Sequence, residues 1–119
     1  MGTALCKQLS ENDIAFIKGV RGAGLFPEMG VDVVVHLASR VHVMKESVID
    51  PLAVYREANS LATVTLARQA VAAGVRRFVF VSTVKVNGEG RPAAYVESDA
   101  PSPTDPYAVS KYEAEQGLW

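Results

Sequence analysis

Tyr107 and Lys111 stand four residues apart in a stretch that follows Asp105 and Pro106. Residues at this spacing share one face of a helix, and Asp followed by Pro is typical of a helix start. A nearby ammonium favours the phenolate form of a tyrosine, and so does the positive end of a helix. The pair therefore supplies a mechanism by which a tyrosine could take up and return a proton. The alternative is a surface Tyr–Lys pair without chemistry, and the spacing taken alone favours that alternative.

Two hydroxyl residues, Ser82 and Thr83, follow the apolar run at residues 78–81. At the end of a strand, such hydroxyls can donate a hydrogen bond to a substrate oxygen whose charge changes during a reaction. Hydroxyls at strand ends also commonly bond to local backbone, and without further context this second interpretation is favoured.

Asn59 interrupts the otherwise apolar, core-facing stripe of a predicted helix, which consists of Leu52, Tyr55, Ala62 and Leu66. A buried amide without partners costs on the order of 1–3 kcal/mol, so this side chain must bond to something. It either braces a neighbouring strand or loop or contacts a ligand directly, and both interpretations stay open.

The elements that must position these residues follow from two continuous apolar runs, residues 33–37 and 78–81. Such runs predict strands that are buried on both faces, and His36 within the first is interpreted as a core histidine. Between them, Asp50 and Pro51 start a helix that runs to about Ala73 and stops at Gly74. Strands joined by such a helix are predicted to be parallel, through a right-handed crossover.

Strand, helix, strand and helix in this order predict half of a doubly wound α/β sheet. Ligands of such sheets bind at the carboxyl ends of the strands. This rule directs attention to residues 37–39 and to Ser82 and Thr83. Residues 84–104, rich in Gly, Pro, Ser, Asp and Glu, exceed ordinary connection lengths and predict a functional loop beside the same site.

The N-terminal third is less regular. Residues 3–9 have helical spacing, and residues 14–17 (Ile-Ala-Phe-Ile) are a candidate short strand. Residues 19–30 hold four glycines and a proline, which predicts a loop.

Composition restricts the class of protein. The chain has 119 residues, which fits one domain over 1–119, with 12 basic against 13 acidic residues. This balance predicts neither nucleic acid nor membrane as a partner, and no apolar run approaches the roughly 18 residues of a membrane span. The single cysteine, Cys6, excludes an internal disulfide and a cysteine-cluster metal site, and we predict no metal. A cytoplasmic location is expected.

Several segments combine into one pattern: His36-Leu37-Ala38, Asn59 followed by Thr63, residues 76–83 (Arg-Arg-Phe-Val-Phe-Val-Ser-Thr) and Tyr107-x-x-x-Lys111. In this order and spacing they resemble the extended short-chain dehydrogenase/reductases. Within these, the chain is similar to the NAD-dependent epimerase/dehydratase group that acts on nucleotide sugars and is UDP-glucose 4-epimerase-like. The resemblance covers about residues 31–119. Residues 84–90 also resemble bacterial members that handle UDP-sugars for surface polysaccharide.

The resemblance implies a role for each matching residue. Tyr107 would be the acid/base that moves the proton of a sugar hydroxyl while hydride passes between that carbon and nicotinamide. Lys111 would assist the phenolate and hold the nicotinamide ribose, and Thr83, supported by Ser82, would hydrogen-bond the reacting oxygen. The implied catalytic residues are thus Thr83, Tyr107 and Lys111. The implied cofactor-binding residues are Gly2, Leu37, Ala38, Ser39, Asn59, Ser82, Tyr107 and Lys111.

The implied cofactor is NAD, with NADP kept open because Lys18 and Arg21 could accommodate a 2′-phosphate. The implied activity is 4-epimerisation of a UDP-hexose by transient oxidation and re-reduction at C4. A UDP-4-keto-sugar reductase of the same family and a non-catalytic dinucleotide-binding or interaction fragment are the alternatives. A 4,6-dehydratase is disfavoured, because dehydratases place acidic residues directly after the catalytic hydroxyl residue, whereas Val84 and Lys85 follow Thr83 here.

Family members begin with a strand before a glycine-rich turn, whose last glycine would be Gly2, and end with a lobe that holds the nucleotide sugar. The chain is therefore expected to be a partial Rossmann-like domain that lacks the first strand and the C-terminal substrate lobe and is inactive alone. A second helical stripe is also apolar and predicts a homodimer through helix faces; it consists of Val54, Ala58, Leu61, Val64 and Val71.

Overall fold

The computed structural model of the protein describes residues 2–17, 30–41 and 50–119. Its elements are, in chain order, α1 (Gly2–Glu11), β1 (Val33–His36), α2 (Pro51–Tyr55), the π-helical segment η1 (Arg56–Leu61), α3 (Ala62–Ala72), β2 (Arg77–Phe80), the 3-10 segment η2 (Val84–Asn87) and α4 (Pro106–Gly117). The predicted glycine-rich loop, up to residue 29, and the cofactor candidates Lys18 and Arg21 lie outside the described residues.

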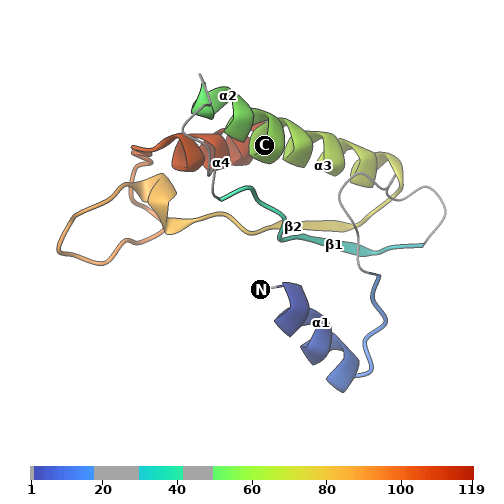
Figure 1. Cartoon of the computed structure of the whole chain (residues 1–119). Coiled ribbons are helices and arrows are strands. Elements are labelled where there is room, and N and C mark those ends of the chain that lie inside the picture. Colours follow the sequence, from blue (N-terminus) through green and yellow to red (C-terminus); the bar gives the residue numbers. More distant parts are fainter. Residues whose placement is uncertain (1, 18–29, 42–49) are drawn as a thin grey trace.

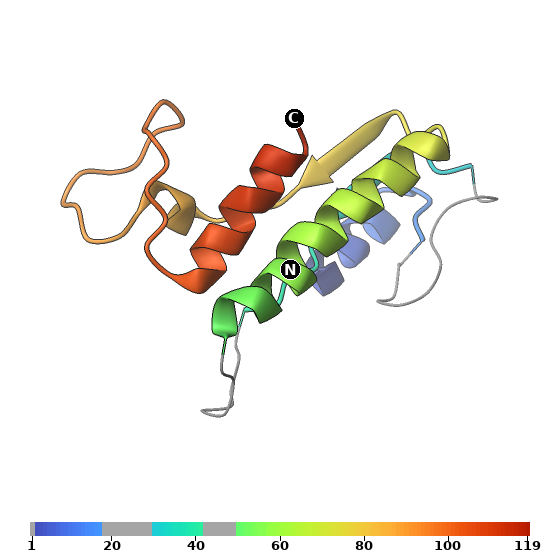
Figure 2. The same cartoon turned by 90° about the horizontal axis from the view of Figure 1, so that it is seen from above.

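The two strands form a parallel pair, as the sequence predicts. Val34 lies opposite Phe78, and His36 lies opposite Phe80. Helices α2, η1 and α3 form one continuous rod that crosses one face of this pair, and α4 runs beside it (Figures 1 and 2). The βαβα order is thus confirmed, and the carboxyl ends of both strands point towards the start of α4.

The predicted start and end of the long helix are confirmed. The Asp50 carboxylate accepts a hydrogen bond from Ala53 N at 3.0 Å, which caps the first turn. Gly74 adopts a φ of 75°, which a residue with a side chain rarely takes up, and the helix ends just before it. The middle of the rod, however, is the π-helical segment η1, which propensity and apolar spacing do not predict.

The expectation that both strands are buried on both faces is wrong for the described residues. Val34 is buried, but Val33, Val35 and Val79 are 48%, 43% and 39% exposed. The helical rod and α4 cover one face only. α1 lies on the other side of the sheet (Figure 1) but buries none of its residues, so it leaves that face open.

The N-terminal expectations have a mixed outcome. The predicted helix over residues 3–9 is confirmed as α1. The candidate strand at residues 14–17 is wrong, because Ile14 and Ile17 are 53% and 56% exposed and no described segment pairs with them. The backbone N–H of Ile14 instead donates to Leu9 O at 3.0 Å, back to α1.

The most deeply buried residues are small or polar and lie on the helical rod and on α4: Asn59, Thr63, Ala70, Ala108, Ser110, Lys111 and Ala114. Within the described ranges, no helix has the length and apolar content to cross a membrane. The same ranges contain no group of three or more side chains able to hold a metal ion.

Candidate active site

The ends of both strands and the start of α4 meet at one edge of the sheet. Val81 N donates to His36 O at 3.2 Å, which extends the strand pair by one residue. Lys111 on α4 donates from Nζ to Val81 O at 2.8 Å. These bonds bring α4 against the position where β2 ends.

Tyr107 lies in the first turn of α4, as the sequence predicts. The Asp105 carboxylate caps this turn by accepting from Ala108 N at 2.8 Å. The Tyr107 ring meets Tyr55 edge-on, with centroids 6.1 Å apart, and Tyr55 donates its hydroxyl to Val41 O at 3.0 Å. Beside Tyr107 lies a groove of about 330 Å³, lined by Val41, Tyr55, Lys85, Asp105, Pro106 and Tyr107.

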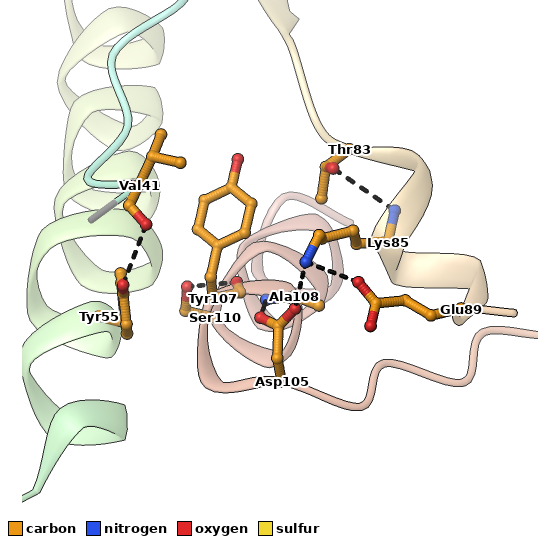
Figure 3. Close-up of polar contacts among 9 residues, drawn as sticks. All are labelled: Val41, Tyr55, Thr83, Lys85, Glu89, Asp105, Tyr107, Ala108 and Ser110. Carbon is orange, nitrogen blue, oxygen red and sulfur yellow. Dashed lines mark hydrogen bonds and ion pairs between the residues drawn. The ribbon is translucent and has the colours of Figure 1, made fainter. Parts of the chain in front are cut away.

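Thr83 has an extended backbone between β2 and η2, and its Oγ1 accepts a hydrogen bond from Lys85 N at 3.4 Å. This is the local backbone bond that the sequence alone favours. Accepting it leaves the hydroxyl hydrogen of Thr83 free to be donated. In Figure 3 the Tyr107 ring extends from α4 into the space between Val41 and Thr83, and the Thr83 oxygen is turned towards the Lys85 N–H.

The Ser82 hydroxyl is buried, and among the described residues its Oγ has no hydrogen-bond partner. Burying a hydroxyl without a partner costs on the order of 1–3 kcal/mol, so native structures rarely leave one unpaired. Ser82 precedes Thr83 at the same strand end. Its orphaned oxygen therefore marks a position where a bound polar group would complete the site.

Lys111 is 2% exposed and holds its ammonium 3.9 Å from the centre of the Phe80 ring. Burial lowers the pKa of Lys111 to about 8, against a smaller opposing effect of Glu115. No hydrogen bond joins Lys111 to Tyr107 within the described part of the chain. Tyr107 and Lys111 lie on one face of α4, as predicted. The Lys111 ammonium, however, bonds to the carbonyl of Val81, which follows the end of β2.

Asn59 is 1% exposed and lies in η1. Its Nδ2 donates to Arg40 O at 3.0 Å and to Ser110 Oγ at 3.1 Å. Its Oδ1 accepts from Arg40 N at 2.7 Å and from Ser39 Oγ at 3.4 Å. Two donors and two acceptor sites are the full capacity of an amide. Asn59 therefore braces the segment after β1, and its amide has no site left for a ligand.

The remaining cofactor candidates gather at the end of β1. A Cβ placed on Gly2 would lie 4.0 Å from Leu37 Cδ1, so the start of α1 approaches the residue that follows the strand. Ala38 is exposed and Ser39 half-buried next to it. The structure thus brings Gly2, Leu37, Ala38 and Ser39 to the same sheet edge as Ser82 and Thr83.

The sequence analysis gave no place in the site to two residues near this edge, Ser110 and Lys85. Ser110 accepts from Asn59 and donates to Tyr107 O at 2.7 Å, so it links the helical rod to α4. Lys85 pairs with Asp105 at 2.9 Å across the groove. The position of Ser110 between Tyr107 and Lys111 is a signal that could have identified it. The contact of Lys85 with Asp105 carries no such local signal, because the two residues are 20 apart in the sequence.

Comparison with known proteins gives a consistent result. The model of the NAD dependent epimerase/dehydratase family matches residues 18–119. A UDP-glucose 4-epimerase of Vibrio cholerae is 47% identical over 94 residues, which cover 77% of this chain and 29% of that protein. The chain thus spans less than a third of the length of this curated relative.

Solved structures show the same likeness in fold. A dTDP-glucose 4,6-dehydratase from Streptomyces venezuelae, DesIV, with NAD and TYD bound, matches with a TM-score of 0.66 and 40% identity. That match covers 74% of this chain and 27% of DesIV. MoeE5 in complex with UDP-glucose and NAD matches with a TM-score of 0.78 and 26% identity, over 98% of this chain and 44% of MoeE5. The predicted partial Rossmann-like fold is therefore confirmed.

Proposed function

The chain belongs to the NAD dependent epimerase/dehydratase family, and we propose that it carries the catalytic residues of an NAD-dependent enzyme that epimerises a UDP-hexose at C4. One observation carries this proposal: the Tyr107 ring extends from the first turn of α4 into the space between Val41 and Thr83, on the segments that follow two parallel strands (Figure 3). The similarity to a UDP-glucose 4-epimerase supports the choice of substrate and reaction.

The residues at the sheet edge fit a dinucleotide. The buried Ser82 oxygen lacks a polar group to bond among the described residues, and the start of α1 lies close to Leu37 at the same edge. Residues that would hold NAD are Gly2, Leu37, Ala38, Ser39, Ser82 and Lys111, with Asn59 supporting Ser39 from the helical rod. When bound, NAD supplies the hydride acceptor for the C4 carbon and later the hydride donor.

The chain's own residues handle the proton. Tyr107 takes the proton of the C4 hydroxyl as the oxygen becomes a carbonyl, and returns it when the sugar is reduced on its other face. Thr83 donates a hydrogen bond to the same oxygen and holds it opposite Tyr107. The buried Lys111 ammonium adds a positive charge at the end of β2, which favours negative charge on a nearby oxygen.

A 4,6-dehydratase is the strongest competitor, since DesIV is 40% identical over the region it shares with this chain. Epimerisation is favoured because Val84 and Lys85 follow Thr83. The Val84 side chain is exposed, and the Lys85 ammonium pairs with Asp105 and Glu89. Neither residue can act as the carboxylic acid that dehydration would use at this position.

Replacement of Tyr107 by Phe in the full-length protein tests the proposal. The variant keeps the ring against Tyr55 but removes the hydroxyl, so UDP-hexose epimerisation is expected to fall by about 10²-fold or more. Tyr112→Phe on the same helix is the matched control and is expected to keep wild-type turnover. Undiminished turnover in Tyr107→Phe would refute the proposal.

The same assay separates an epimerase from a reductase. An epimerase returns its cofactor to the starting state, so the absorbance of reduced nicotinamide stays constant during turnover. A UDP-4-keto-sugar reductase consumes reduced nicotinamide, and its absorbance falls in step with product.

We also propose that the full-length protein is a homodimer through the outer face of the helical rod. Leu61 and Val71 on this face are 63% and 77% exposed. A shallow apolar groove continues the face between α3 and α4 and is lined by Val64, Ala67, Arg68, Val71, Gly117 and Leu118. A role in polysaccharide biosynthesis and a cytoplasmic location stay predictions.

A further inference from the structure

Lys85 lies between two carboxylates at the edge of the groove that contains Tyr107 (Figure 3). Its Nζ is 2.9 Å from Asp105 Oδ2 and 2.6 Å from Glu89 Oε1. The Glu89 contact stays within one stretch of chain, since the two residues are four apart. The Asp105 contact instead joins η2, directly after Thr83, to the first residue before α4.

Asp105 serves two purposes with its two oxygens. Oδ1 caps α4 by accepting from Ala108 N at 2.8 Å, while Oδ2 receives the Lys85 ammonium. Burial alone would raise the pKa of Asp105, but the hydrogen bonds from Lys85 and Ala108 outweigh it and hold the pKa below its ordinary value. The carboxylate is therefore charged at neutral pH, and the contact with Lys85 is an ion pair.

Lys85 also contacts the other half of the site. Its backbone N–H donates to Thr83 Oγ1 at 3.4 Å. One residue thus touches the Thr83 hydroxyl through its backbone and the start of α4 through its side chain. Tyr107 follows Asp105, whose carboxylate Lys85 binds, by two residues in the sequence.

We propose that Lys85 is a positioning residue, which sets the position of Tyr107 relative to Thr83 by clamping Asp105 to η2. This inference rests on the proposed function. η2 is also anchored by the buried Val86, whose carbonyl accepts from Ser102 N at 2.9 Å, so the ion pair is one of several contacts that hold the segment. Lys85 therefore adjusts where Thr83 sits relative to α4 and does not maintain the fold.

A positioning role and a role in stability predict losses of different kinds when Lys85 is replaced. Ion pairs with exposed side chains contribute little to folding, and the Lys85 side chain is 45% exposed. A displacement of about 1 Å between reacting groups, in contrast, can cost on the order of 10²-fold in rate. Loss of the clamp should therefore lower turnover and leave stability nearly unchanged.

The test compares Lys85→Met, Lys85→Arg and Glu89→Gln in the full-length protein with NAD and UDP-hexose. Lys85→Met is expected to lower kcat by about 10- to 100-fold, with KM and the thermal unfolding midpoint close to wild type. Lys85→Arg keeps the charge and is expected to restore most of kcat. Glu89→Gln keeps the Lys85–Asp105 contact and is expected to stay near wild type.

Asp105→Asn supplies an independent arm, because asparagine caps a helix as well as aspartate but carries no charge. It should lower kcat like Lys85→Met, and the double variant should be no slower than either single variant. Wild-type kcat in Lys85→Met, no recovery in Lys85→Arg, or additive losses in the double variant would each overturn the inference. If Tyr107→Phe is inactive while Lys85→Met is not, only the positioning role fails, whereas full activity in Tyr107→Phe refutes the proposed function itself.

Discussion

Lys111 carries its ammonium to a position that is 2% exposed, with a carbonyl and a ring face as neighbours. Burial lowers its pKa from 10.5 to about 8. Between these two values the unfolded chain binds the proton and the folded chain does not. The free energy of unfolding therefore rises as pH increases through this window, and the penalty for the buried charge is fully present below pH 8.

Lys111→Met should remove this pH dependence. At pH 7 the cofactor-free variant is expected to unfold with a free energy higher by about 1–3 kcal/mol, because no charge is buried, although activity is lost. The difference from wild type should shrink as pH rises from 8 to 10.5. Denaturant unfolding across this range measures it, with the exposed Lys7→Met as control. A difference that is constant with pH would contradict the buried charge.

Among the elements, η1 shows how a helix adapts to a buried amide. A π turn adds one residue to the loop closed by each backbone hydrogen bond and is often found at functional sites. Here it places Asn59 between the segment after β1 and Ser110 on α4, with all four amide bonds formed. One side chain thereby fixes the β1 side of the site and the helix that carries Tyr107.

Asn59→Ala is expected to destabilise the protein by about 1–3 kcal/mol, because the partners of the amide lose their bonds. Hydrogen exchange of residues 37–41 should accelerate more than exchange in β2. Ser60→Ala, next to it in η1, is the control, since the described residues give the Ser60 side chain no hydrogen bond. Unchanged exchange at residues 37–41 would show that Asn59 does not brace this segment.

The molecule as a whole is covered on one side. The sheet buries one face under the helical rod and α4 (Figure 2). The outer face of the rod keeps the apolar side chains of Leu61 and Val71 exposed. Exposed apolar patches of this kind commonly mark contacts between proteins. The helical face is the part of the surface on which the proposed homodimer rests.

Val71→Lys places a charge at the centre of the proposed dimer contact and is expected to shift the full-length protein from dimer towards monomer. Sedimentation velocity at several protein concentrations measures the shift. Val96, 53% exposed in the loop after η2, supplies the control variant Val96→Lys, which should leave the dimer intact. Equal masses for wild type and Val71→Lys would refute the helix-face dimer.

The order strand, helix, strand, helix and the limits of these helices could be predicted from local pattern, whereas the π-helical segment η1 could not, and the strand predicted at residues 14–17 was wrong. The Asp-Pro pairs before α2 and α4 and Gly74 after α3 act on their immediate neighbours, so helix limits are readable without a fold. The parallel pairing followed from two apolar runs joined by one helix. Helical spacing likewise placed Tyr107 and Lys111 on one face.

The partners of the buried polar groups were not readable in the same way. Lys111 bonds to Val81, 30 residues away, Lys85 to Asp105, 20 residues away, and Asn59 to Ser110, 51 residues away. The exposed strand face could not be predicted for the same reason. A run of valines does not reveal which neighbouring element covers it. Spacing along a helix or strand selects a direction for a side chain, but the acceptor or surface in that direction belongs to a distant segment that arrives only when the chain folds.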